Sequence, residues 1–134
     1  MSNQSERIVT LLLIENDDET RRLLIEILRD RPYRILLAIN EDNAIEWLLS
    51  NDRINIDLIL MNQVKISRQE CQKAIAKIYQ QTSLSSTIPS VIMAERYHAT
   101  LEGTEEKVGD NQYIIYLEDV EQLFNFIHQL CFNE

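Results

Sequence analysis

Apolar runs and segments with helical periodicity alternate along the chain. Each run is unbroken or nearly so and is bounded by polar or turn-forming residues. Short continuous runs of this kind are typical of strands that are buried on both faces of a parallel sheet. The sequence therefore predicts five strands, at residues 9–14, 33–39, 56–61, 89–94 and 113–117.

The segments between these runs favour helices. Leu23, Leu24, Ile27 and Leu28 fall on one face of the first, which ends near the Arg31-Pro32 pair, and Leu48 and Leu49 are expected to point inward from the second. The segment 95–110 is only weakly periodic and is interrupted by Gly103, so we expect a short or distorted helix there. Residues that can cap a helix amino terminus precede the other segments: Asp17 or Asp18, Asn40 or Asp42, Ser67, and Asp119.

Alternating strands and helices predict an α/β fold of parallel strands joined by right-handed crossovers, with helices on both faces of the sheet. The 134 residues are enough for one domain and too few for two. We find no internal repeat, linker or low-complexity tract. The chain is therefore expected to form a single domain over residues 1–134, with its core at 8–131.

Charge and cysteine content narrow the function classes. The net charge of −9 disfavours binding to nucleic acid or to an anionic membrane, since both are negative too. Cys71 and Cys131 have no metal-ligand spacing and are expected to be reduced core thiols. The amino-terminal residues have no apolar signal region, and no apolar run approaches the roughly 20 residues of a membrane span. We therefore expect a cytoplasmic protein.

The motifs "DDETRRLL", "DLILM", "IPSVIMA" and "YIIY" occur in that order. Together with the alternation of elements, they resemble the CheY-like receiver domain of two-component response regulators, over about Val9 to Leu130. The resemblance implies a flavodoxin-like three-layer sandwich with a five-stranded parallel sheet in the order 2-1-3-4-5. It also implies phosphorelay signalling as the biological setting.

Several positions depart from the pattern of an active receiver. The acidic pair that helps hold Mg²⁺ corresponds to Glu15 and Asn16, so one of the two acids is lost. The phosphate-accepting aspartate corresponds to Asn62, and the hydroxyl residue that ends the fourth strand corresponds to Ala94. The chain thus resembles a degenerate pseudo-receiver that lacks the phosphoacceptor.

The fifth strand departs from the pattern in the same way. Tyr116 and Leu117 stand where the family has a lysine and a proline. The aromatic residue that changes rotamer in many receivers is matched by Tyr113, which becomes a candidate switch residue. A phenol can donate a hydrogen bond, but it does not supply the positive charge of a lysine.

These substitutions remove the chemistry of phosphoryl transfer. The amide of Asn62 is a poor nucleophile, and Ala94 has no hydroxyl with which to stabilise phosphoryl oxygens. Mg²⁺ prefers carboxylate and phosphate oxygens, so Glu15 and Asp17 are weak metal candidates and we expect no cofactor. A helix-capping cluster explains the acids at 15–19 equally well. We therefore expect neither catalytic residues nor enzymatic activity.

The leading hypothesis is a stand-alone, phosphorylation-independent receiver that acts through protein–protein contacts. Its partner would be a signalling protein, such as a histidine kinase or a downstream regulator. The resemblance points to the surface of the fourth helix, fifth strand and fifth helix, which would also serve a homodimer. Two alternatives stay open: a conventional receiver that accepts phosphate on another acid such as Asp17, and a module that binds a small molecule in the altered pocket.

Overall fold

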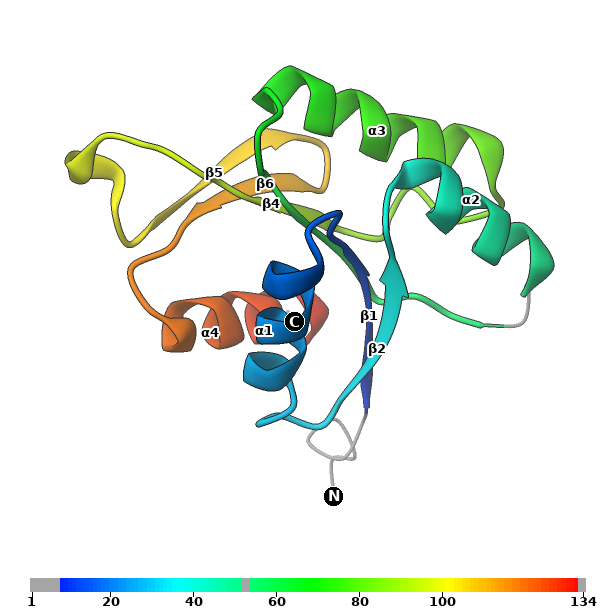
Figure 1. The fold of residues 1–134 in the computed structure, drawn as a ribbon, viewed down its shortest axis with the longest axis horizontal. Coiled ribbons are helices and arrows are strands. Elements are labelled where there is room, and N and C mark those ends of the chain that lie inside the picture. Colours follow the sequence, from blue (N-terminus) through cyan, green and yellow to red (C-terminus); the bar gives the residue numbers. More distant parts are fainter. Residues whose placement is uncertain (1–7, 52–53, 133–134) are drawn as a thin grey trace.

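The computed structural model describes residues 8–51 and 54–132. The amino-terminal residues 1–7, to which the prediction of no signal segment applies, lie outside the described residues. Helices cover both faces of a central sheet (Figure 1). The strands are β1 (Val9–Ile14), β2 (Tyr33–Ala38), β3 (Leu58–Asn62), β4 (Ser90–Met93), β5 (Thr104–Gly109) and β6 (Gln112–Tyr116); the helices are α1 (Asp18–Leu28), α2 (Glu41–Ser50), α3 (Arg68–Gln81) and α4 (Val120–Cys131), with a 3₁₀ turn, η2, at Ala99–Leu101.

The sheet order in the described residues is β2-β1-β3-β4-β6-β5. All neighbours from β2 to β6 are parallel, and β6 is the fifth strand of the prediction. The predicted parallel order 2-1-3-4-5 is therefore confirmed for these strands. The prediction of a five-stranded sheet with five helices is wrong, because the described chain has six strands and four α-helices.

The difference lies in residues 95–110, where we expected a short or distorted helix. This segment forms η2 and then β5, which pairs antiparallel with β6 as a hairpin. Asp110 and Asn111 make the turn, and Asn111 adopts a φ of 60°, a left-handed conformation that asparagine tolerates well. Because Val108 and the run after Gln112 favour extended backbone, the turn closes a hairpin and no helix starts.

The hairpin changes the surface that we expected to serve a homodimer. Within the described chain, β5 occupies the edge of the sheet beyond β6, and the 3₁₀ turn η2 is the one helical element between β4 and β6, where we expected an α-helix (Figure 1). The expected surface of fourth helix, fifth strand and fifth helix is therefore made here of β5, β6 and α4. Four of the six residues of β5 are exposed.

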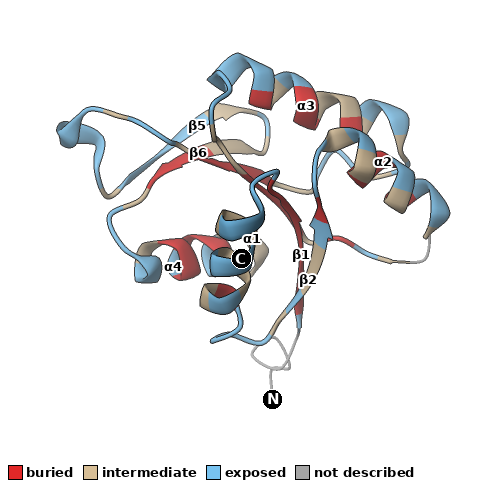
Figure 2. Ribbon diagram, viewed as in Figure 1, coloured by how far each residue is buried: buried red, intermediate tan, exposed pale blue. Residues whose placement is uncertain are grey.

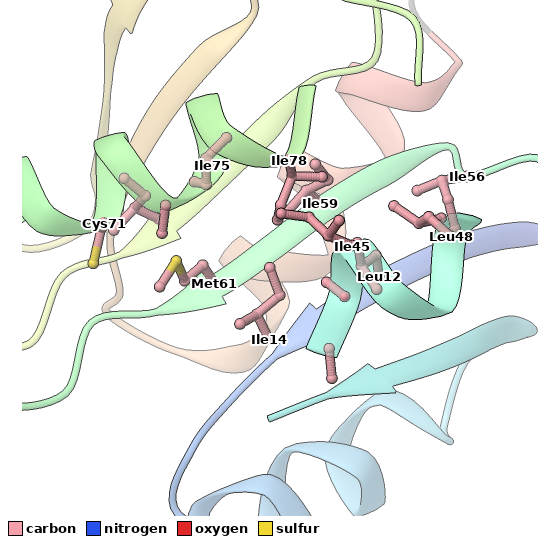
Figure 3. Packing of buried hydrophobic residues seen from close by; sticks show 14 of the residues in the cluster. Leu12, Ile14, Ile45, Leu48, Ile56, Ile59, Met61, Cys71, Ile75 and Ile78 are labelled. Carbon is pink, nitrogen blue, oxygen red and sulfur yellow. The ribbon is translucent and has the colours of Figure 1, made fainter. Parts of the chain in front are cut away.

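Two hydrophobic clusters hold the layers together. One joins the sheet to α2 and α3 and the other joins it to α1 and α4, and the central strands are buried on both faces (Figure 2). Figure 3 shows Cys71, Ile75 and Ile78 of α3 packed against β3. Cys71 is buried as predicted, whereas Cys131 is partly exposed.

The predicted caps start the helices. The side chains of Asp17, Asn40, Ser67 and Asp119 each accept a hydrogen bond from a backbone N–H group of the first turn of their helix. The prediction that Leu23 and Leu49 point into the core is wrong, because Leu23 is 57% exposed and Leu49 is 63% exposed. Both lie at the border of the apolar stripe of their helix, where a small rotation of the helix turns a side chain to solvent.

Candidate functional site

A cavity of about 150 Å³ opens at the carboxyl ends of the central strands. Parallel strands end at one edge of the sheet, so residues that are distant in sequence meet there. β1 ends at Ile14 and leads into Glu15 and Asn16, while β3 ends at Asn62. The structure thus brings together three of the predicted pocket residues. The lining residues are Ile14, Glu15, Asn16, Ile39, Asn40, Glu41, Met61, Asn62, Val64 and Ile66.

The carboxylate of Glu15 is the buried charge of this site. Its residue is 1% exposed. Asn62 Nδ2 donates a hydrogen bond of 2.7 Å to Glu15 Oε1, and the backbone N–H of Asp17 donates one of 2.9 Å to Oε2. A buried carboxylate needs hydrogen bonds to remain charged, and here neutral N–H groups supply them. The amide of Asn62 therefore binds directly to the acid that follows β1.

The turn after β1 is held by its own side chains. Arg21 Nη1 donates a hydrogen bond of 2.9 Å to the backbone oxygen of Glu15, and the same guanidinium contacts the carboxylate of Asp18. Asp17 Oδ2 accepts hydrogen bonds from the backbone N–H and the hydroxyl of Thr20. These bonds lower the pKa of Asp17, the hydroxyl of Thr20 being the largest cause. Asp17 is thus engaged as the cap of α1.

Ala94 and Tyr116 are not among the residues that line the cavity. The backbone N–H of Ala94 donates to Ile115 O at 3.1 Å, and its side chain packs in the cluster beneath α2 and α3. The ring of Tyr116 packs edge-on against Tyr97, with 5.3 Å between ring centroids. Ala94 and Tyr116, which we aligned with the hydroxyl residue and the lysine of receiver domains, therefore contact other neighbours in this chain.

The hydroxyl of Tyr116 binds the hairpin. It donates a hydrogen bond of 2.7 Å to Glu106 Oε1, and Arg68 of α3 lies 3.3 Å from Glu106 Oε2. The hydrogen bond from Tyr116 is the first cause of the lowered pKa of Glu106, followed by the one from Arg68. The pKa of Tyr116 is raised, first by its burial and then by its bond to the carboxylate. β6, β5 and α3 are thus joined through one acid.

The candidate switch residue Tyr113 packs on the opposite side of the sheet. Its ring lies edge-on to Phe126 of α4, with ring centroids 5.4 Å apart and planes at 85°. The residue is partly exposed. This aromatic contact links β6 to α4. Together with β5, these two elements form the surface that stands in place of the expected fourth helix, fifth strand and fifth helix.

Sequence reasoning placed only Glu15, Asn16 and Asn62 in the pocket, and four of the lining residues that it missed change the character of the cavity. Ile39, Val64 and Ile66 form an apolar rim, and Glu41 adds a second acid at the start of α2. Ile39 follows the second strand directly, and Ile66 precedes the Ser67 cap, so both sit in loops at the same edge as Asn62. The signal available was an aliphatic residue in each of these loops, where polar residues are usual.

Nowhere in residues 8–51 and 54–132 do three or more His, Cys, Asp or Glu side chains gather in a way that could hold a metal ion. None of the helices in these ranges combines the length and apolar character that crossing a lipid bilayer requires.

Comparisons with known proteins were made by sequence and by structure. No protein-family model and no curated protein matches the chain. Solved receiver domains do match its fold. The receiver domain of a sensor histidine kinase from Pseudomonas aeruginosa PAO1, with a magnesium ion in its active site cleft, has a TM-score of 0.66 at 16% identity, over 95% of this chain and 100% of that one.

Two more solved structures give the same result. A response regulator described as putative, from Chloroflexus aurantiacus, has a TM-score of 0.66 at 18% identity, over 95% of this chain and 100% of that one. CheY6 from R. sphaeroides, in complex with the phosphorylated P1 domain of CheA3, has a TM-score of 0.61 at 14% identity, over 92% and 96% of the two chains. At these identities the likeness establishes the fold of a receiver domain, with its parallel-dominated α/β sheet.

Proposed function

We propose that this chain is a receiver-like module of two-component signalling that acts through protein–protein contacts without being phosphorylated on an aspartate. The hydrogen bond from Asn62 Nδ2 to Glu15 Oε1 is the observation that carries the proposal. It places a neutral, non-nucleophilic amide at the strand end where a phosphate-accepting receiver needs a free carboxylate oxygen. We propose a binding role and no enzymatic activity, in the cytoplasm as expected from the sequence.

The other polar positions support the same conclusion. A phosphoryl group needs donors aimed at its oxygens. Ala94 offers no side-chain donor, and the hydroxyl of Tyr116 is engaged with Glu106. The alternative acceptor, Asp17, uses Oδ2 to cap α1 through two hydrogen bonds to Thr20. Phosphorylation there would compete with the start of the helix.

A magnesium ion has no part in the proposal. Each oxygen of Glu15 already accepts one N–H group, and Asn62 next to it offers an amide in place of a second carboxylate. Asn16 adds a neutral amide, and Asp17 is held by Thr20. Mg²⁺ demands near-octahedral oxygen ligands and gives up its waters reluctantly, so this donor set does not suit it.

The proposed partner is another signalling protein, such as a kinase or a downstream regulator. The structural neighbour CheY6 was crystallised in complex with the phosphorylated P1 domain of CheA3, which supports a signalling protein as the partner. The surface of β5, β6 and α4 carries Glu105, Glu118 and Glu121 around one groove. Because two copies would bring these like charges together, we favour a different protein over a homodimer at this surface.

Intact mass spectrometry after incubation with acetyl phosphate and Mg²⁺ tests the proposal. We expect the wild-type chain to gain no phosphoryl group, and an active receiver treated alongside it to gain one. An Asp17→Asn variant separates the routes, because it keeps the capping oxygen but loses the carboxylate. A phosphoryl group on the wild type that is absent from Asp17→Asn would replace the proposal with the alternative acceptor, and one that persists in the variant would refute it outright.

A further inference from the structure

We propose that the cavity above Glu15 receives a lysine or arginine side chain of a partner protein, so that the partner supplies the cation that the site lacks. The inference rests on the proposed function, because it treats this edge of the sheet as a binding surface. The cavity of about 150 Å³ is large enough for one extended side chain, and it opens at the carboxyl ends of β1 and β3.

The floor of the cavity holds a buried charge without a cation. Glu15 is 1% exposed, and within residues 8–51 and 54–132 its carboxylate accepts hydrogen bonds from the amide of Asn62 and the N–H of Asp17 alone. Among the residues that the structure describes, Glu15 forms no ion pair. A carboxylate has about four lone-pair sites, so two oxygens with one bond each can accept another donor. A cationic donor would compensate the desolvated charge more fully than neutral N–H groups do.

Two positive side chains, Arg21 and Lys65, act on residues of the turn after β1. Arg21 binds the backbone oxygen of Glu15 and the carboxylate of Asp18. The charge of Lys65 acts on Asp17, whose pKa it helps to lower, although less than Thr20 does. Neither cation forms an ion pair with Glu15 within the described ranges. The described residues thus leave this carboxylate without an ion-pair partner, and a partner protein can supply one.

The walls of the cavity suit the stem of a long basic side chain. Ile39 is 49% exposed and Ile66 is 36% exposed, and Val64 lies with them in the lining. Lysine and arginine bury their methylene stems along apolar surface while their charged heads reach polar groups. Glu41 also lines the cavity and adds a second acid. Aliphatic walls above a carboxylate floor thus match a basic side chain at both of its ends.

The net charge of the chain favours a basic side chain in the cavity over an acidic segment or a second copy of the chain. The net charge of −9 favours an approaching basic segment and opposes an acidic one or a second copy of the chain. A hydrated metal ion would gain nothing from the aliphatic residues that line the cavity. A basic side chain needs only one added hydrogen bond.

The probe for this inference is n-butylammonium, which reproduces the end of a lysine side chain. n-Butanol and butyrate serve as the neutral and anionic controls of the same length. We expect ¹H–¹⁵N spectra to show saturable shifts at Asn16, Ile39, Asn62 and Val64 with butylammonium. Butanol can donate a hydrogen bond to the same carboxylate but has no charge to compensate it, so it should bind at least about tenfold more weakly, and butyrate should not bind.

Two variants locate the binding. Glu15→Gln removes the charge and should abolish the preference for butylammonium over butanol. Ile39→Ser changes only an exposed wall residue, so it leaves the fold intact and should weaken both probes severalfold. Glu118→Gln, in the groove beside α4, is the matched acidic control and should change neither affinity.

Several results would overturn the inference. They are equal binding of the three probes, no saturable shift in the wild type, shifts that cluster around Glu105 and Glu118, or competition by MgCl₂ well beyond that by NaCl at equal ionic strength. The outcome is independent of the phosphorylation experiment. A chain that gains a phosphoryl group refutes the proposed function whatever butylammonium does, and a chain that gains none still fails this inference if the cavity ignores the probe.

Discussion

Replacing Asn62 by aspartate puts a second carboxylate against a buried one. In the wild type, Asn62 Nδ2 lies 2.7 Å from Glu15 Oε1 and donates a hydrogen bond to it. Asn62→Asp keeps the size of the side chain but exchanges the donor for an oxygen. Two carboxylates in contact cannot both stay ionised, so the pKa of one of them must rise in the folded state.

The size of the effect follows from two limits. If the pair takes up a proton at pH 7, holding a carboxyl group with a usual pKa near 4.3 in its neutral form costs about 1.4 kcal/mol per pH unit, or about 4 kcal/mol. If the introduced carboxylate turns outward instead, the loss is that of a hydrogen bond to a charged group, about 1.5–3 kcal/mol. Asn62 is only partly buried, so the second route is open. We therefore expect the free energy of unfolding to fall by about 2–4 kcal/mol at pH 7.

The sign of the pH dependence is fixed by the raised pKa. A carboxyl group whose pKa is raised by folding binds a proton more readily in the native state than in the unfolded one. The deficit of Asn62→Asp relative to wild type should therefore be largest at neutral pH and shrink as the pH falls towards 5. Once protonated, the introduced carboxyl group can again donate to Glu15, which restores the bond.

Urea denaturation of both proteins at pH 5, 6 and 7 measures this difference, with Asn16→Asp as control. Asn16 lines the same cavity but is exposed, so its variant adds the same charge with a change within about 0.5 kcal/mol. Millimolar Mg²⁺ should stabilise only Asn62→Asp, by about 1.4 kcal/mol at ten times its Kd. An Asn62→Asp variant as stable as wild type at pH 7, with a deficit that does not change with pH, would show that the amide of Asn62 does not hold Glu15.

Three further variants test the rest of the structure. Tyr116→Phe removes the main cause of the lowered pKa of Glu106, so ¹³C carboxyl titration should show that pKa rising towards 4.5, and an unchanged value would contradict the assigned bond. Asp17→Asn keeps the cap of α1 but does not titrate; since the wild-type pKa is lowered, the wild type loses stability as the pH falls through that pKa, and the variant should lose less between pH 5 and 3. Ile75→Ala empties a 1% exposed core site and should lower the free energy of unfolding by about 3–4 kcal/mol in urea, whereas a loss below 1 kcal/mol would place Ile75 outside the core.

The parallel core could be predicted because its signals are local. Continuous apolar runs mark strands that are buried on both faces, and polar caps mark where the helices begin. The first strand was predicted at the bounds that the structure shows, and the caps at Ser67 and Asp119 are confirmed. The borders of the apolar faces of the helices were harder to predict. Leu23 and Leu49 fit the apolar spacing, but each lies where the stripe meets solvent.

The hairpin was missed because its signal lies in the turn. β5 carries exposed charged residues, so it lacks the apolar run on which the other strands were recognised. Edge strands are often charged in this way, since charge opposes pairing with other chains. The informative residues were Gly109, Asp110 and Asn111 ahead of a β-prone run, a combination that favours a hairpin. Reading Gly103 as the interruption of a helix obscured it.

The candidate site was predictable as a set of positions and unpredictable as a set of contacts. The sequence placed Glu15, Asn16 and Asn62 at one edge of the sheet, and the structure brings all three to one cavity. It could not show that the amide of Asn62 bonds to Glu15, because side-chain direction depends on packing and not on spacing. The same holds for Tyr116, whose hydroxyl finds Glu106 only because β5 lies beside β6.

The contact between Tyr116 and Glu106 concerns one of two neighbouring positions, Ala94 and Tyr116, at which we expected the chain to depart from the family pattern. Ala94 and Tyr116 pack on the face of the sheet that α2 and α3 cover, together with Tyr97 from the loop before η2. Tyr97 donates a hydrogen bond to the backbone oxygen of Leu117, so this loop closes over the end of β6. The hydroxyl of Tyr116 is then directed to Glu106 on β5, and not to the cavity at Glu15. The hairpin thus supplies the partner for Tyr116, the residue that we aligned with the lysine of receivers, and β6 provides no cation to the carboxylate of Glu15.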